Sequence, residues 1–170
     1  MSLKPRTKVP ALSLPTVDGG HFDLAASKPS SFSMLVFYRG LHCPICKGYL
    51  RDLDRKLDDF AQRGVEAVAI STDTQARAQQ AKTEWGIERL PIAYGLSVDD
   101  ARRWGLYIST SMGQKEPPLF SEPGLFLIQP DGVLYCSSVQ TMPFARPSFA
   151  ELLQAVAFVT EKHYPARGEA

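Results

Sequence analysis

The pattern of apolar and polar positions predicts two buried strands in the first half of the chain. Residues 33–38 are almost uniformly apolar and lie between a segment rich in serine and proline and Gly40. Residues 65–71 form a similar apolar run that starts directly after Gly64. A short, unbroken apolar run between such residues is typical of a strand that is covered on both faces.

The segment between these two strands has the periodicity of an amphipathic helix. From Pro44 to Gly64 apolar side chains recur at intervals of three and four, at Cys46, Leu50, Leu53, Leu57 and Phe60. Proline is favoured in the first turn of a helix and glycine directly after its end. We therefore expect one long helix with Cys43 as its N-cap, and the order strand, helix, strand implies parallel strands.

Shorter patterns complete the chain. A second helix is predicted from a cap at Thr72 or Asp73 to Trp85, where Gly86 ends it. The remaining elements, in chain order, are a hairpin strand at 9–14 with a turn at 17–20, a strand at 92–96, a capped helix from Ser97 to Gly105, a loop at 106–123, hairpin strands at 124–128 and 133–139, and a capped helix from Ser148 to Glu161. We expect the tail beyond Pro165 to be frayed.

These elements predict an α/β sandwich, with a central mixed β-sheet flanked by helices and an N-terminal β-hairpin extension. The chain has neither an internal repeat nor a linker long enough to divide it. We therefore expect a single domain over residues 1–170, with its core between about residues 9 and 162.

Composition and charge exclude several classes of protein. Among 170 residues, 19 Lys and Arg balance 18 Asp and Glu, which leaves no charge excess for nucleic acid or an anionic membrane. No apolar run approaches the roughly 20 residues of a bilayer span. Pro5, Pro10 and Pro15 interrupt the apolar centre that a secretory signal would need. We therefore expect a cytoplasmic protein with small partners, no nucleic acid and no membrane.

The motif that carries chemistry is Cys43-Pro44-Ile45-Cys46, at the junction of a predicted strand and a helix. Free N–H groups and the helix dipole stabilise a thiolate there, so we expect the pKa of Cys43 to lie well below about 8.5. As an exposed N-cap, Cys43 can accept a hydrogen bond from the N–H of Ile45 or Cys46, and the spacing allows a disulfide. A C-x-x-C motif in this context indicates a redox pair.

Half of a zinc site and a pair of inert thiols are the alternatives to a redox pair. Zinc would need two more ligands, and the only histidines, His21, His42 and His163, are isolated in the sequence. We therefore expect no metal, and the proposed chemistry needs no bound cofactor. Cys136, in the last hairpin strand, is expected to be a small buried hydrophobic residue. The His42 side chain is expected to be exposed to solvent.

Several segments resemble those of one known family. They are the opening segment 9–19, Phe37-Tyr38 followed by Cys46, the strand at 68–73, and the hairpin at 126–133. The family is the peroxiredoxins of the alkyl hydroperoxide reductase and thiol-specific antioxidant type, which have a thioredoxin-like fold, and the resemblance covers residues 9 to about 160. Arg146 matches the arginine that this family places beside its catalytic cysteine.

The chain departs from the family motif at two positions. Arg39 replaces the proline that shields the thiolate, and Cys43 replaces the threonine whose hydroxyl binds the peroxide. When the chain is aligned with the family motif at Phe37-Tyr38, the peroxidatic position falls on Cys46. Exposure and helix capping instead favour Cys43 as the nucleophile. For peroxide we favour Cys46 as the nucleophile and Cys43 as the resolving thiol that meets the reductant. Pro123 lies where the thioredoxin fold often carries a cis-proline.

The resemblance implies a thiol-dependent peroxidase-like oxidoreductase that reduces hydroperoxides with Cys46, Cys43 and Arg146. Its partners would be the hydroperoxide and a thioredoxin- or glutaredoxin-like reductant, and a homodimer is compatible with the sequence. Two alternatives stay open: a thiol-disulfide oxidoreductase that acts on protein disulfides, and a non-catalytic redox sensor.

Overall fold

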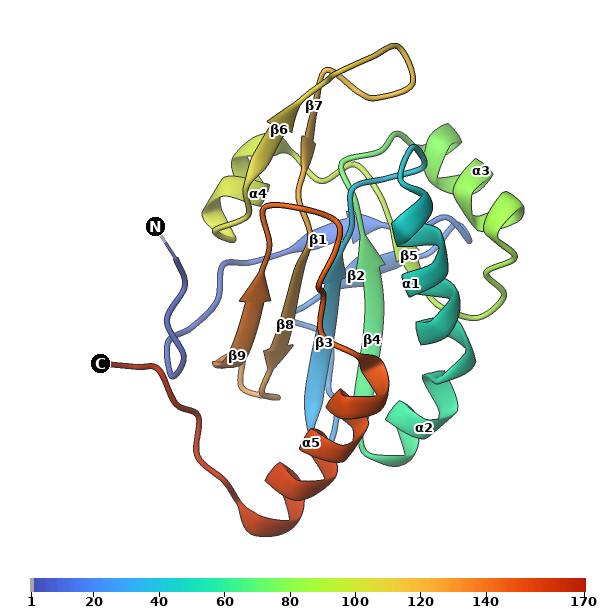
Figure 1. Ribbon diagram of the computed structural model, residues 1–170. Coiled ribbons are helices and arrows are strands. Elements are labelled where there is room, and N and C mark those ends of the chain that lie inside the picture. The colour runs from blue at the N-terminus through green and yellow to red at the C-terminus, as the bar shows by residue number, and fades with distance from the viewer. Residues whose placement is uncertain (1) are drawn as a thin grey trace.

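A mixed, five-stranded β-sheet forms the centre of the protein (Figure 1). The computed structural model describes residues 2–170. The strand order is β5-β4-β3-β8-β9, with β3, β4 and β5 parallel and with β8 and β9 antiparallel to their neighbours. The strands of this sheet are β3 (Phe32–Phe37), β4 (Val65–Ile70), β5 (Ile92–Ala93), β8 (Gly124–Ile128) and β9 (Leu134–Val139). The expected thioredoxin-like sandwich with a mixed sheet is confirmed.

Each face of the sheet is covered by a separate layer, and an apolar cluster lies beneath each layer. One layer consists of four helices, namely α1 (Pro44–Arg55), α2 (Leu57–Gln62), α3 (Gln75–Trp85) and α5 (Phe149–Lys162). The other layer contains the helix α4 (Val98–Arg103) and the N-terminal hairpin formed by β1 (Ser13–Pro15) and β2 (His21–Asp23).

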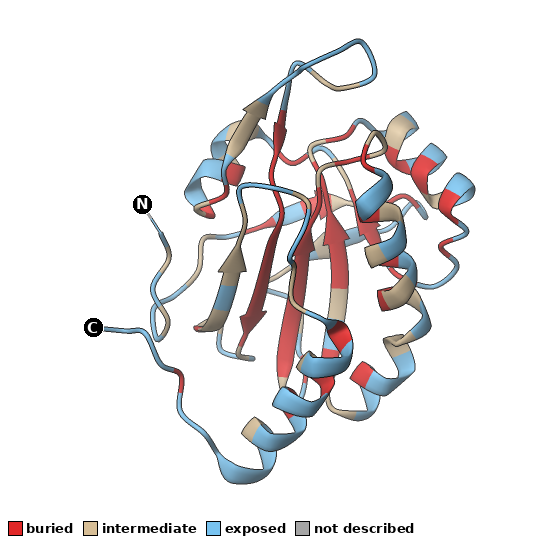
Figure 2. Ribbon diagram, viewed as in Figure 1, coloured by how far each residue is buried: buried red, intermediate tan, exposed pale blue. Residues whose placement is uncertain are grey.

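Strand β3 shows why its sequence is apolar throughout. Successive side chains of a strand point to opposite faces of the sheet. Met34 and Val36 accordingly join the cluster beneath the four helices, whereas Leu35 and Phe37 join the cluster on the other face. Figure 2 shows β3 and β8 as buried along most of their length, while the outer surfaces of the helices are exposed.

Several predicted elements differ from the structure in their bounds or caps, among them the first strand, which is limited to β1. The long helix expected up to Gly64 is divided at Lys56 into α1 and α2. The next helix is capped by Thr74, whose side chain accepts from the N–H of Arg77, and not by Thr72 or Asp73. The strand expected at 92–96 is limited to β5, because after Ala93 the chain turns away to form other hydrogen bonds.

The segment 106–123, expected to be a loop, contains a two-stranded hairpin of its own. It consists of β6 (Ile108–Thr110) and β7 (Leu119–Ser121), which pair only with each other and extend beyond the central sheet (Figure 1). The strands are too short, and their neighbours too rich in proline, to give a clear period-two signal.

The C-terminal tail is packed against the N-terminal segment, so the expectation of a frayed end is wrong over part of its length. Ala166 is buried, and its carbonyl accepts from Nε of Arg6 at 2.9 Å. Within residues 2–170, no helix combines the length and the apolar composition that crossing a membrane requires.

Candidate active site

The two cysteines of the C-x-x-C motif lie where the central strand passes into the first helix. A turn between Gly40 and Cys43 separates β3 from α1, and the N–H of Cys43 donates to the carbonyl of Gly40 at 3.1 Å. Gly40 has a φ of 130°, a conformation that residues with a side chain rarely adopt. Pro44 occupies the first helical turn, and Cys43 is the N-cap as the sequence predicts.

Both sulfurs are buried, which corrects the expectation that Cys43 is exposed. Cys43 is 1% exposed and Cys46 is 0% exposed, and both belong to the apolar cluster between the sheet and the helices. Ile45, between them, is 42% exposed and faces outward. The sequence identifies a helix start, but burial of the first turn depends on segments far away along the chain.

Hydrogen bonds within the motif favour one ionised sulfur. The backbone N–H of Cys46 donates to Sγ of Cys43 at 3.3 Å, as an N-cap interaction requires. The Cys46 thiol also donates to Cys43 and is the largest cause that lowers the pKa of Cys43 to about 6, with smaller contributions from Arg146 and Arg39. Burial and the neighbouring Cys43 sulfur raise the pKa of Cys46. Within the pair, these interactions therefore favour the thiolate on Cys43 over a thiolate on Cys46.

Arg146 reaches this pair from the segment between β9 and α5. Its Nη2 donates to Sγ of Cys46 at 3.6 Å, and its Nε donates to the carbonyl of Pro143 at 2.7 Å. The guanidinium lies over the ring of Tyr49, 4.4 Å from the ring centroid. Nη1 is buried and has no hydrogen-bond partner among residues 2–170. Arg146 therefore has one donor without a partner among those residues, on a guanidinium that also contacts Sγ of Cys46.

A second cation, Arg39, comes from the segment between β3 and the motif. Nε of Arg39 forms an ion pair with the buried carboxylate of Glu122 at 3.3 Å, and its guanidinium is 4.9 Å from the ring centroid of Phe120. The second oxygen of Glu122 accepts from Oγ of Ser109 at 2.6 Å. The β6–β7 hairpin therefore contacts the segment that leads to the cysteines, and Arg39 adds positive charge near Cys43.

His42 is half-buried, so the expectation that it is exposed is also wrong. Its ring packs edge to face on Phe120 at 4.6 Å, and neither ring nitrogen has a partner in the described part of the chain. Burial, together with the charge of Arg39, lowers the pKa of His42 below its usual value of 6.5. Both effects favour the neutral imidazole.

Other residues singled out in the sequence lie elsewhere or differ in geometry. Cys136 is on β9, opposite Leu127, and burial raises the pKa of its thiol to about 11. The peptide bond before Pro123 is trans and not cis. Within residues 2–170, no group of three or more His, Cys, Asp or Glu side chains is arranged to hold a metal ion.

Sequence reasoning missed the residues that support the site from a distance. Tyr49, one turn after Cys46 on α1, donates its hydroxyl to the carbonyl of Pro147 at 2.6 Å and thereby anchors the segment that carries Arg146. Its position three residues after Cys46 is a signal that could have placed it on the same helix face. Glu122 gave no local signal, because its partner Arg39 is far away in the sequence.

Comparisons with known proteins bear on the family and the fold of the chain. The model of the AhpC/TSA family matches residues 5–136. The search among curated proteins found no match. Peroxiredoxin 6 of Arenicola marina superposes with a TM-score of 0.78 at 19% identity, over 95% of this chain and 76% of that chain. The reduced 2-Cys peroxiredoxin of Plasmodium vivax gives the same TM-score at 18% identity, over 95% of this chain and 84% of that chain.

A third structure is of a different kind. A putative thiol:disulfide interchange protein DsbE from Chlorobium tepidum superposes with a TM-score of 0.68 at 21% identity, over 93% of this chain and 98% of that chain. At these identities the structures establish the fold alone. The family model covers most of the sequence, including both cysteines of the motif, and on that ground the chain belongs to the AhpC/TSA family.

Proposed function

We propose that the protein reduces hydroperoxides with the Cys43–Cys46 pair and that Arg146 assists the reaction. The observation that carries this proposal is the adjacent pair of thiols, one with its pKa lowered to about 6, beside the guanidinium of Arg146, whose buried Nη1 has no hydrogen-bond partner in the described part of the chain. A thiolate is the species that attacks peroxides.

The first step forms a sulfenic acid. The Cys43 thiolate attacks the outer oxygen of the hydroperoxide, so that an S–O bond forms and the O–O bond breaks. The sulfur becomes S–OH, and the leaving alkoxide or hydroxide takes a proton from solvent. Nη1 of Arg146 is the group that we assign to stabilise the negative charge on the oxygens, because charge-assisted hydrogen bonds are the strong ones.

The second step closes the disulfide. Sγ of Cys46 attacks the sulfur of the Cys43 sulfenic acid, and the departing hydroxide takes the Cys46 thiol proton and leaves as water. An external dithiol of the thioredoxin or glutaredoxin type then supplies two electrons and two protons, becomes a disulfide itself, and restores both thiols.

This order of attack differs from the one favoured by the sequence alignment. The alignment places the nucleophile at Cys46, but the N–H and the thiol of Cys46 both donate to Cys43, and burial raises the pKa of Cys46. Trapping with dimedone after one equivalent of peroxide distinguishes the two orders. We expect a rapid adduct on Cys43 in Cys46→Ser, and an adduct on Cys46 in Cys43→Ser as the only rapid product would reverse the assignment.

Thiol-disulfide exchange with proteins is the second candidate function, supported by the similarity to the putative DsbE. A protein disulfide has to bring its own backbone close to the attacking sulfur, whereas Cys43 is only 1% exposed. A small hydroperoxide needs much less room. Burial therefore favours the peroxide as oxidant.

The test compares the two reactions in one preparation. We expect catalytic consumption of hydrogen peroxide with a thioredoxin-type reductant, and much slower reduction of insulin disulfides. Cys43→Ser should abolish peroxide turnover, whereas the matched variant Cys136→Ser should retain it, because Cys136 lies on β9 with a raised pKa. Rapid reduction of insulin without peroxide turnover would replace the proposal by its alternative.

A further inference from the structure

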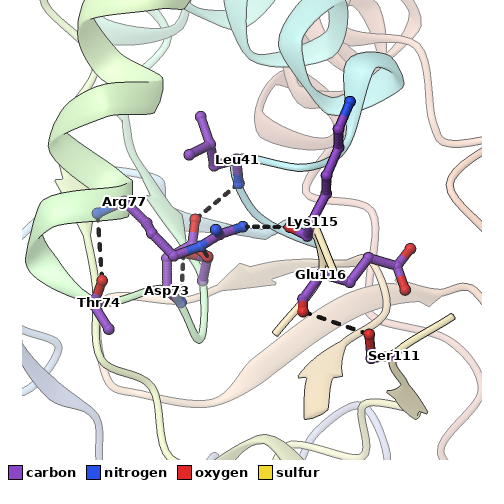
Figure 3. A network of polar contacts seen from close by, with 8 residues as sticks. Leu41, Asp73, Thr74, Arg77, Ser111, Lys115 and Glu116 are labelled. Carbon is purple, nitrogen blue, oxygen red and sulfur yellow. Dashed lines mark hydrogen bonds and ion pairs between the residues drawn. The ribbon is translucent and has the colours of Figure 1, made fainter. Parts of the chain in front are cut away.

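Asp73 is a buried carboxylate that the proposed chemistry does not use. It follows β4, at the same edge of the sheet as the turn after β3, and its side chain is fully buried. One carboxylate oxygen accepts the backbone N–H of Leu41 at 2.8 Å, and the other accepts Nε of Arg77 at 3.1 Å. Figure 3 shows the hydrogen bonds that link Asp73 to Leu41 and to Arg77.

The contact between Asp73 and the turn is close enough to exclude a side chain at Gly40. A Cβ atom built on Gly40 would lie 2.7 Å from one carboxylate oxygen of Asp73 and 2.9 Å from the other. The next residue donates to that carboxylate, and Cys43 donates its N–H back to Gly40. The backbone of Gly40 and Leu41 is therefore fixed against the Asp73 side chain, and Cys43 is tied to this backbone through the carbonyl of Gly40.

Asp73 is itself held from several directions. Its N–H donates to Oγ of Ser71 at 3.2 Å, and its carbonyl accepts the N–H of Gly95 at 2.9 Å. Arg77, which pairs with the carboxylate, also donates Nη2 to the carbonyl of Lys115 at 3.2 Å in the loop of the β6–β7 hairpin (Figure 3). A group that is anchored in this way can position a neighbouring turn, because it does not move with that turn.

We propose that Asp73 is a positioning residue for Cys43, which it places as the N-cap of α1 by holding the N–H of Leu41 and the backbone of Gly40. This inference rests on the proposed role of Cys43 as the reactive thiol, and it adds a residue that touches neither sulfur. The carboxylate acts through the turn and takes no part in the transfer of protons or electrons.

The direction in which the pKa of Cys43 shifts when Asp73 is replaced separates this positioning role from a direct effect of charge. A negative charge near a thiol disfavours the thiolate, so removing the charge of Asp73 would lower the pKa of Cys43 if charge alone mattered. Loss of positioning has the opposite effect, because Cys43 then loses its hydrogen bonds with the first turn of α1. A residue needed only for stability would leave the pKa unchanged in the folded protein.

The experiment measures alkylation by iodoacetamide against pH in Asp73→Asn, on a Cys136→Ser background. We expect the pKa of Cys43 to rise by about one unit, which slows alkylation about tenfold at a pH below that pKa. Asp54→Asn is the matched control, since Asp54 also accepts backbone N–H groups, from Glu88, Arg89 and Leu90, away from the cysteines. This control should leave the pKa of Cys43 unchanged.

Circular dichroism establishes that each variant is folded before its pKa is compared. If Asp73→Asn does not fold, Asp73→Glu takes its place, because it keeps the charge and displaces the carboxylate by one methylene group. An upward shift in a folded variant supports positioning, and an unchanged or lowered pKa overturns it. The readout requires no peroxide, so it remains valid if the proposed peroxidase activity fails.

Discussion

Replacing Arg146 with alanine removes a cation that touches a sulfur of the pair. The substitution deletes the hydrogen bond from Nη2 to Sγ of Cys46, at 3.6 Å, and the uncommitted Nη1 donor. It also removes the contact with the ring of Tyr49 and the hydrogen bond from Nε to the carbonyl of Pro143. The turn that carries residue 146 keeps a second anchor, because the Tyr49 hydroxyl still donates to the carbonyl of Pro147. The expected defect is therefore chemical and not a loss of the fold.

The magnitude follows from the kind of bond that is lost. Hydrogen bonds to charged groups contribute about 1.5–3 kcal/mol, which corresponds to a rate reduced by roughly 10-fold to 150-fold. The distance of 3.6 Å is long for a bond to oxygen but within reach for sulfur, so we place the expected loss near the lower end of this range. The Coulombic contribution of Arg146 to the lowered pKa of Cys43 acts in the same direction.

Stopped-flow fluorescence after mixing with hydrogen peroxide measures the oxidation step directly. Arg63→Ala is the matched control, because Arg63 is a partly exposed arginine whose Nη1 donates to the carbonyl of Asp59 in the helix α2 segment. The control should oxidise at the wild-type rate. Wild-type kinetics in Arg146→Ala, with an unchanged circular dichroism spectrum, would refute the role of Arg146.

Three further predictions concern the pair, its second cation and the sheet. The rate of oxidation by peroxide should rise as the pH increases through about 6, because the thiolate of Cys43 then forms. In a pH-rate profile, Cys46→Ala should move this midpoint upward, because Cys43 loses the thiol of Cys46 as a hydrogen-bond donor. Arg39→Leu should destabilise the protein by about 3–5 kcal/mol in urea unfolding, since the buried carboxylate of Glu122 loses its cation, and it should raise the pKa of Cys43. Adding Glu122→Leu should restore the stability but leave the pKa of Cys43 raised. Gly124→Ala should cost about 1–3 kcal/mol in the same assay, because a Cβ there would overlap the neighbouring side chains, and an unchanged unfolding midpoint would contradict this packing.

The sequence was sufficient for features that depend on neighbours in the chain. The apolar run at β3 and the spacing of Leu50 and Leu53 predict a strand and a helix, and Cys43 at their junction is the N-cap in the structure. These features follow from local periodicity and from the capping preferences of a helix start. Arg146, which also contacts the pair, was predicted from its match to a family position and not from local periodicity.

The features that could not be predicted depend on contacts between distant segments. Cys43 is buried because the first turn of α1 packs against the sheet, and no local pattern records this. Asp73 looks like a helix cap in the sequence, yet its carboxylate faces Leu41, 32 residues away. The β6–β7 hairpin has strands too short for a clear periodic signal, and Glu122 at its end forms its ion pair with Arg39, which is far away in the sequence.

The measurement that tests the central claim most directly is peptide mapping of the reduced protein after one equivalent of hydrogen peroxide. The account predicts one disulfide between Cys43 and Cys46 per molecule, with Cys136 still open to alkylation under denaturing conditions. It predicts that a thioredoxin-type dithiol returns this species to three free thiols. A stable sulfenic acid without a disulfide, or a bridge that includes Cys136, would contradict the account.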